Sequence, residues 1–287
     1  MAKSKPISRV FALTFTLAES DTTRVTNALF AAGAGGVEEQ SASRSIVYTD
    51  DPAAARRFIS AAREGARSEV RVDVKELDPS WQSDWLRYLR PEPITPRWVL
   101  QPTSIRSPAP RGKRRLWYEP DAAFGVGSHP TTRLAARAVE ACCSRLRPPS
   151  LLDVGTGNGV LALLGVVSGA KRALGIDIDP IAVRAARINA RANGLGSRCR
   201  FSERGLDELT SRHPVVVANI EVWVLLDLAP ELARVTAPAG RLLLTGFLQE
   251  RAREVRGAFE RLGFTAGRPR RQGEWGLLEL ARGVARL

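Results

Sequence analysis

The chain has 287 residues, 44% of them hydrophobic, enough to bury the cores of one large domain and one small one. Its formal net charge is +13, but residues 1–77 hold 11 Lys and Arg against 10 Asp and Glu and form no basic arm. No run approaches the roughly 18 apolar residues that span a bilayer, and only a short apolar stretch follows the basic start, so we expect no signal peptide. Three cysteines fit neither a disulfide framework nor a zinc site. We expect a soluble, monomeric, cytoplasmic protein with no bound metal and no membrane partner.

The excess of positive charge lies after residue 77, for example in residues 111–115 and 268–271. Only five of the 43 basic residues are Lys. An arginine-favouring codon bias explains this composition as well as contacts with RNA or an acidic protein do, and we predict no stable nucleic-acid partner.

Residues 1–77 have the pattern of a small α+β domain. Strands are predicted over residues 10–17, 45–49 and 69–76, and helices from Asp21, as the capping residue, to about residue 32 and over residues 51–67, opened by Pro52. The order strand, helix, strand, helix, strand indicates a ferredoxin-like fold.

Residues 78–118 form a predicted linker between the two domains. Trp81, Trp85 and Trp98 stand between prolines, and a proline-rich loop precedes a predicted strand over residues 115–118. The tryptophans indicate either a short amphipathic helix that docks on a domain or a hinge that also shapes a substrate cleft.

Residues 119–287 form the second predicted domain, in which helices and strands alternate. This rhythm predicts an α/β, Rossmann-like fold with a mainly parallel sheet and helices on both faces. Helices are expected over residues 134–146, 159–168, 180–193, 225–235 and 250–262, and strands over residues 150–154, 171–177, 215–219, 241–245 and 275–281.

A glycine loop follows the first strand of this domain. Gly155, Gly157 and Gly159 stand where a strand turns into a helix, and glycine there lets the backbone approach a ligand closely. Asp177 ends the next strand, a position from which a carboxylate accepts hydrogen bonds from ribose hydroxyls. The pattern indicates an adenosine-binding site.

Two details favour S-adenosylmethionine over a dinucleotide as the ligand. Gly159 follows Gly157 by two places, whereas the dinucleotide fingerprint has its third glycine three places after the second. Asp153 places an anion beside the loop, where it would repel a pyrophosphate but could hold water or the amino group of a methionine moiety. We therefore predict a class I methyltransferase fold.

Two further clusters accompany the loop. Residues 119–132 contain Phe124, Gly125 and Thr132 in a segment that can close over a bound ligand, and Thr131 or Thr132 can cap the helix that follows. His129 in this segment is more typical of a hydrogen-bonding fixture than of an acid or base. Asn219 ends a predicted strand at the ligand-binding edge of the sheet, and its amide can orient an incoming amine.

With these clusters the chain resembles the PrmA family, which methylates ribosomal protein eleven of the large subunit. The resemblance rests on the run Ala123-Phe-Gly-x-Gly-x-His-Pro-Thr-Thr, on Asp153-x-Gly-x-Gly-x-Gly, and on matching segments near Asp177, Asn219 and Trp275. Val126 and Glu221 depart from the family pattern, since Thr and an apolar residue usually stand there.

The resemblance implies that residues 1–77 recognise the protein substrate and that its lysine side chains and N-terminal amine accept the methyl groups. It also implies that S-adenosylmethionine is the cofactor. We predict that the cofactor contacts Phe124, Gly125, Thr132, Asp153, Gly155, Gly157, Asp177 and Asn219.

The expected chemistry is methyl transfer to a neutral amine. We expect Asn219 to position the amine, and Glu221 or water to carry its proton away. Two alternatives stay open. One is methylation of another basic protein or of RNA, although Ala-Asn-Ile-Glu differs from the Asn-Pro-Pro-aromatic sequence that commonly presents a flipped base. The other is a catalytically idle S-adenosylmethionine-binding factor for ribosome assembly, which Val126 suggests.

Overall fold

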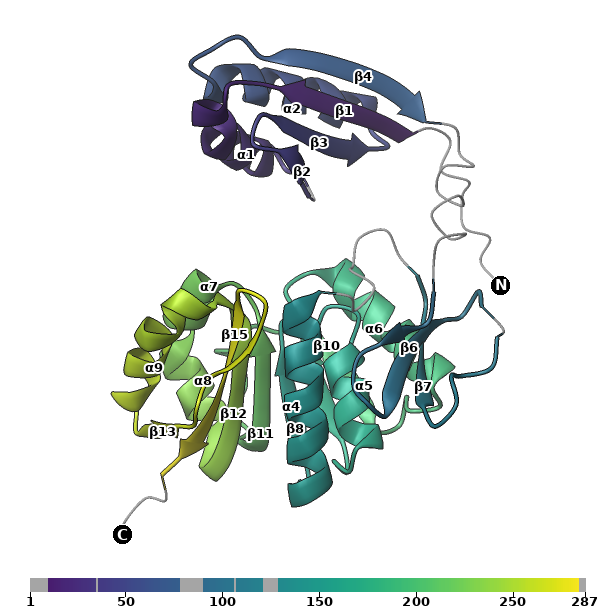
Figure 1. Ribbon diagram of the computed structural model, residues 1–287, viewed down its shortest axis with the longest axis vertical. Helices are drawn as coiled ribbons and strands as arrows, with labels where there is room; N and C mark the ends of the chain where they lie inside the picture. Colours follow the sequence, from purple (N-terminus) through teal and green to yellow (C-terminus); the bar gives the residue numbers. More distant parts are fainter. Residues whose placement is uncertain (1–9, 35, 78–89, 106, 121–128, 284–287) are drawn as a thin grey trace. The chain divides into compact units, whose positions relative to one another are not determined.

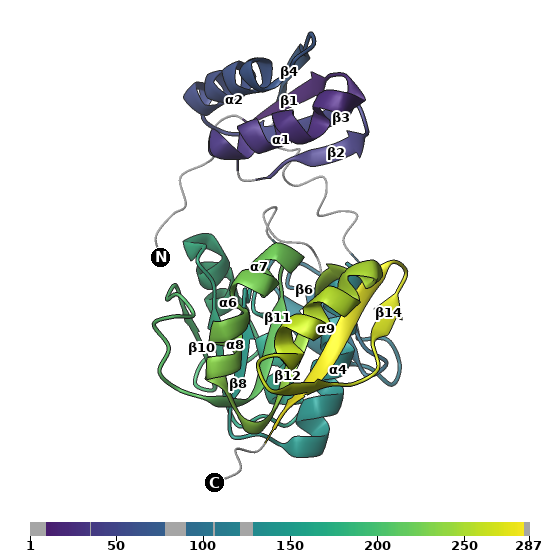
Figure 2. The same ribbon diagram turned by 90° about the vertical axis from the view of Figure 1, so that its left-hand side faces the viewer.

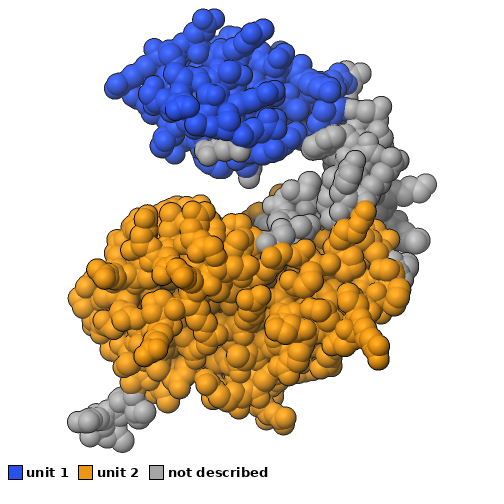
Figure 3. Space-filling view, in the orientation of Figure 1, with its two compact units in different colours: residues 1–89 blue, residues 90–287 orange. Residues whose placement is uncertain are grey.

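The structure is a computed structural model that describes residues 10–34, 36–77, 90–105, 107–120 and 129–283. The chain divides into two compact units, residues 1–89 and 90–287 (Figure 3). Within the described ranges, none of the helices has the length and apolar character needed to cross a membrane.

The small unit is a four-stranded sheet with two helices. Its sheet order is β2-β3-β1-β4 and all its neighbouring strands are antiparallel, in the β-α-β-β-α-β order of the ferredoxin-like fold. Strand β2 is the element that the sequence pattern missed, because its residues EEQS are polar. The elements are β1 Val10–Thr16, α1 Thr22–Ala31, β2 Glu38–Ser41, β3 Arg44–Thr49, α2 Pro52–Gly65 and β4 Arg71–Leu77.

A separate core holds the small unit together. Leu13 and Phe15 alternate along β1 and are fully buried, in one cluster with Leu29 of α1 and Phe58 of α2. The prediction that Asp21 caps α1 is wrong, because its side chain makes no capping bond there. Its Oδ2 instead accepts hydrogen bonds from the backbone of residues 67 and 68, so that it fixes the chain beyond α2.

The large unit is built on an eight-stranded sheet. Its main path is β10-β9-β8-β11-β12-β15-β13, with β14 paired to β15; the first five strands are parallel and β15 is antiparallel to its neighbours. The strand order therefore reverses between β8 and β11. The strands are β8 Leu151–Val154, β9 Ala173–Ile176, β10 Cys199–Ser202, β11 His213–Asn219, β12 Thr236–Leu248, β13 Phe264–Ala266, β14 Arg270–Gln272 and β15 Trp275–Arg282.

Helices cover both faces of this sheet (Figure 1, Figure 2). Successive residues of β8 serve different cores: Leu151 packs in the cluster that contains α4 to α6, and Leu152 in the cluster that contains α7 to α9. The predicted Rossmann-like class is confirmed. The helices are α4 Pro130–Leu146, α5 Val160–Val167, α6 Pro180–Ala192, α7 Val222–Asp227, α8 Ala229–Val235 and α9 Ala252–Glu260.

Some boundaries differ from the sequence prediction. Helix α4 begins at Pro130, four residues before the apolar pattern starts at Leu134, and its capping side chain is His129 rather than a threonine. The single helix predicted over residues 225–235 is two helices, α7 and α8, that meet at Leu228. Strands β10, β13 and β14 are too short to show a pattern in the sequence.

Residues 90–118, which fall in the predicted linker, lie within the large unit. They form a three-stranded sheet of β5 (Glu92–Pro93), β6 (Trp98–Pro102) and β7 (Arg114–Tyr118). Apolar burial explains this placement, because Trp98, Leu100 and Leu116 belong to the core that α4 to α6 cover. Trp81 and Trp85 lie outside the described residues.

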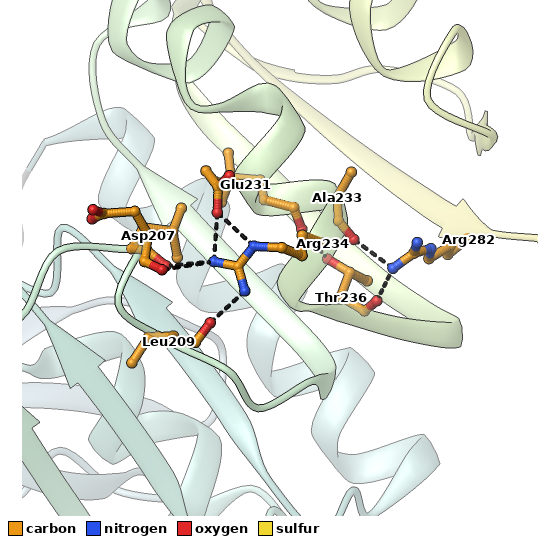
Figure 4. A network of polar contacts seen from close by, with 9 residues as sticks. Asp207, Leu209, Glu231, Ala233, Arg234, Thr236 and Arg282 are labelled. Carbon is orange, nitrogen blue, oxygen red and sulfur yellow. Dashed lines mark hydrogen bonds and ion pairs between the residues drawn. The ribbon is translucent and has the colours of Figure 1, made fainter.

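Arg234 of α8 and Arg282 of β15 join three parts of the large unit (Figure 4). The guanidinium of Arg234 pairs with Glu231 and donates to the backbone carbonyls of residues 206, 207 and 209 in the loop before β11. Arg282 at the end of β15 donates to the carbonyls of Ala233 and Thr236, where α8 leads into β12. Two arginines thus tie this loop, α8 and β15 together.

Replacing Arg234 tests the weight of this network. We expect Arg234→Ala to lower the free energy of unfolding by about 1–3 kcal/mol, because several carbonyls lose a charged donor. Arg251→Ala is the matched control, since Arg251 also pairs with a glutamate three residues away and its side chain is similarly exposed, 43% against 37%, but it donates to no carbonyl in the described structure. Urea unfolding measures both, and equal losses would contradict the assignment.

Candidate functional site

A cavity of about 480 Å³ lies at the carboxyl ends of β8 and β11, where the strand order reverses. Open α/β sheets bind ligands at this point, and the volume is in the range of small-molecule sites. The lining consists of His129, Thr131, Thr132, Gly155, Thr156, Gly157, Asn158, Val160, Leu161, Asn219, Ile220, Glu221, Gly246 and Trp275.

The loop between β8 and α5 requires glycine. Gly155 has φ +67° and Gly157 has φ +53°, in the left-handed region that side chains disfavour. A Cβ at Gly155 would also overlap the side chain of Ile220, which follows β11. The loop therefore packs against Ile220, which lines the same cavity.

The carboxylate of Asp177 anchors this loop from the end of β9. Its Oδ2 accepts a hydrogen bond from the Gly157 backbone at 2.8 Å, and its Oδ1 accepts one from the Asp179 backbone at 3.1 Å. A carboxylate has about four acceptor positions, so the half-buried Asp177 keeps capacity for a ligand hydroxyl. Ile178 follows with its side chain 87% exposed, and so presents an apolar surface beside it.

Asp153 lies beneath the loop and is not part of the cavity lining. It is 1% exposed; its Oδ2 accepts hydrogen bonds from the Thr156 hydroxyl at 2.7 Å and from the Ala162 backbone at 3.1 Å. Its Oδ1 has no partner among the described residues. Burial raises the pKa of Asp153 to about 7, and the charge of Asp177 adds to this effect. The structure thus shows Asp153 holding the loop and the start of α5, and a contact with the cofactor stays a prediction.

The structure brings Asn219 and Thr132 together, although they are 87 residues apart in sequence. The Asn219 amide donates to the Thr132 hydroxyl at 3.5 Å. His129 caps α4, and its ring meets the edge of Trp275 at a centroid distance of 4.8 Å. The first turn of α4, the end of β11 and the start of β15 therefore form one wall of the cavity.

Glu221 lies at the mouth of the cavity and starts α7. It accepts a hydrogen bond from the indole of Trp223 at 2.5 Å, and within the described part of the chain no Lys or Arg lies within ion-pair distance of it. The side chain of Trp223 is 64% exposed. In a chain with net charge +13, an unpaired carboxylate beside an exposed indole makes this rim attractive to a cation.

Several lining residues were missed by the site prediction. Gly246 and Trp275 come from β12 and β15; the segment near Trp275 supported the family resemblance, but neither residue was predicted to line the site. Trp223 could have been noticed as an aromatic residue close to Asn219. Phe124 and Gly125, and also Val126, lie outside the described residues. The described residues contain no group of three His, Cys, Asp or Glu side chains that could hold a metal.

The raised pKa of Asp153 makes stability depend on pH. Between pH 3.8, the ordinary pKa of Asp153, and about pH 7, the folded chain keeps a proton on Asp153 that the unfolded chain loses. This bound proton stabilises the folded chain fully below pH 4, and the stabilisation is lost as the pH rises through 7. We expect the free energy of unfolding of the wild type to fall by on the order of 2 kcal/mol between about pH 5 and pH 8, and Asp153→Asn to lack this decrease. Urea unfolding of both proteins at these two pH values measures it, and parallel pH profiles would contradict it.

Comparisons with known proteins agree with this geometry. Residues 9–283 match the family model of ribosomal protein L11 methyltransferase (PrmA). The ribosomal protein L11 methyltransferase of Sorangium cellulosum is 38% identical over 77% of this chain and 74% of that protein, and that of Deinococcus radiodurans is 36% identical over 88% and 92%. The crystal structure of a ribosomal protein L11 methylase from Lactobacillus delbrueckii aligns with TM-score 0.62 and 26% identity over 68% of this chain and all of that one. The chain therefore belongs to the ribosomal protein L11 methyltransferase family.

Proposed function

We propose that this chain transfers methyl groups from S-adenosylmethionine to lysine side-chain and N-terminal amines of ribosomal protein L11. One observation carries the proposal: a single cavity joins the glycine loop after β8 to the Asn219–Glu221 segment after β11. The first half has the chemistry of a nucleoside site, and the second half has the chemistry of a site for a cationic amine.

The residues on the β8 side fit the cofactor. Gly155 and Gly157 line the cavity without side chains, so a ligand there can approach the backbone, and Asp177 keeps acceptor positions for the two ribose hydroxyls. The exposed Ile178 offers an apolar face for adenine. When bound, S-adenosylmethionine supplies a methyl group on a positively charged sulfur. We assign Thr132 to the same group of contacts, and Phe124 and Gly125 as predicted from the sequence.

The residues on the β11 side fit the acceptor. Methyl transfer requires the amine nitrogen to be held about 3–3.5 Å from the methyl carbon. The Asn219 amide is half-buried, is oriented by Thr132, and can accept a hydrogen bond from the amine. A lysine amine has an ordinary pKa of about 10.4. The amine loses its hydration when it enters the cavity, and this desolvation favours the neutral form over the charged one.

Glu221 acts at the rim rather than in the interior. Its exposed carboxylate attracts the ammonium group before the amine moves inward, and the released proton leaves through Glu221 or through water. The indole of Trp223 orients this carboxylate and offers its own face to the same cation.

We assign recognition of the protein substrate to the small unit. It has its own core, and the lining residues of the cavity that the structure describes come from the large unit, so we assign the small unit a different role. The family match includes this unit as well. A modifier of a ribosomal protein acts where ribosomal proteins are found, and we therefore place the enzyme in the cytoplasm.

Two glycines with the same φ test the cofactor half of the cavity. Gly155 and Gly194 both have φ +67°, but a Cβ at Gly194 meets open space whereas one at Gly155 meets Ile220. We expect Gly155→Ala to weaken binding of S-adenosylmethionine at least about tenfold, and Gly194→Ala to leave the affinity near that of the wild type. Isothermal titration calorimetry measures both affinities. Equal affinities of the two variants for S-adenosylmethionine would show that the glycine loop takes no part in binding it.

Labelled S-adenosylmethionine tests the function as a whole. Incubation with unmodified ribosomal protein L11 should incorporate label, and mass spectrometry should locate it on amines. We expect Asn219→Ala to lower kcat on the order of 100-fold because the amine loses its orienting group. We expect Glu221→Gln, which keeps the size of the side chain, mainly to raise the KM for ribosomal protein L11.

Matched variants and other acceptors complete this experiment. Asn158→Ala is compared with Asn219→Ala at saturating S-adenosylmethionine, since it removes an amide from the cofactor half of the same cavity and should leave kcat near that of the wild type. Label in another basic protein or in RNA, with none in ribosomal protein L11, would replace the proposed substrate. Cofactor binding without label in any acceptor would overturn the enzymatic proposal.

A further inference from the structure

A second cavity, of about 550 Å³, lies at the far ends of α4 and α5. Thr132 near the start of α4 lines the first cavity, whereas Ser144 and Arg147 near its end line the second. Helix α4 has 17 residues and is therefore about 25 Å long. The two cavities are thus separate sites at opposite edges of the sheet.

Among the residues that the structure describes, three arginines and no carboxylate line this second cavity. Arg97 is held in place, because its Nε donates to the nearly buried Glu140 at 2.6 Å and its Nη2 donates to Ser144 at 3.3 Å. Arg114 stacks on the ring of Trp98, with the guanidinium carbon 4.6 Å from the ring centroid. Both arginines are therefore positioned by the neighbouring structure.

Two of the three guanidinium groups lack a counter-charge. Across the described ranges, no Asp or Glu lies within ion-pair distance of Arg114 or Arg147, while Glu140 neutralises only Arg97. Solvated surface arginines do not need a partner, but these two border the same concave space. The positive charges of Arg114 and Arg147 therefore add up at this cavity.

The helix ends at this cavity oppose an anion less than free carbonyl groups would. Several of their carbonyl groups are already engaged: Cys143 accepts from the Arg147 backbone, and Val166 accepts from the Gly169 backbone and from Arg198. The charges of Arg114 and Arg147 therefore carry the attraction for an anion.

We propose that this second cavity binds a phosphate group. Paired guanidinium groups match the geometry of phosphate oxygens. The group can belong to a phosphodiester of RNA or to a free phosphate compound. The inference does not depend on the proposed methyl transfer, because the two sites share no lining residue.

Binding of pyrophosphate and of RNA tests the proposal on the full chain. The probes are sodium pyrophosphate, followed by calorimetry at constant ionic strength, and a fluorescent single-stranded RNA of about 12 nucleotides, followed by anisotropy. The test variant combines Arg114→Gln with Arg147→Asn; Arg147 has φ 45°, a conformation that Asn tolerates. The control combines Arg184→Gln with Arg191→Gln, which removes the same charge from exposed positions on α6.

We expect the wild type to bind pyrophosphate, the test variant to bind it at least about tenfold more weakly, and the control to stay within about twofold. A parallel loss of RNA affinity in the test variant alone assigns the site to RNA, and unchanged RNA affinity assigns it to free phosphate compounds. Absence of binding to the wild type, or equal losses in test and control variants, would overturn the proposal. Unchanged affinity for S-adenosylmethionine verifies that the test variant is folded, and Arg147→Asn alone replaces it if it is not.

Discussion

The contact of Ile220 with two glycines is the constraint on which the candidate site depends. Its side chain occupies the space where a Cβ of Gly155 would lie, and its backbone occupies the space where a Cβ of Gly246 would lie. Ile220 thus brings the chain after β8, the chain after β11 and the end of β12 into direct contact. Asn219 and Glu221 flank it on either side, so the cofactor half and the acceptor half of the cavity share one fixed point.

The sequence was sufficient for features that are local in the chain. The loop from Gly155 to Gly159 and the acidic residue Asp177 are recognisable because their spacing is set by one turn and one strand-to-strand step. Long helices such as α4 and strongly apolar strands such as β11 were predicted for the same reason, since their patterns extend over several residues. The family resemblance drawn from these segments is confirmed by the match over residues 9–283.

Features that depend on tertiary contacts could not be predicted in this way. Asp153 stands near the loop in sequence, but only the structure shows that it lies beneath the loop and bonds to Thr156 and the Ala162 backbone. Trp275 and Gly246 reach the cavity because β15 pairs with β12, a pairing that no local pattern reveals. Asp21 was expected to cap its own helix, but its carboxylate accepts a hydrogen bond from the backbone of Ser68, 47 residues away.

Trp275 also has a consequence for how the site comes into existence during synthesis. Its strand β15 adds to the sheet between β12 and β13, although it leaves the ribosome after both of them and after the other described strands. Until it inserts, β12 is an open edge and the wall formed with His129 is missing. Contacts between such distant segments form late in folding, because a long loop must close first. A nascent chain therefore carries its glycine loop well before it has a complete cavity, and competence for chemistry arises as one of the final events of folding.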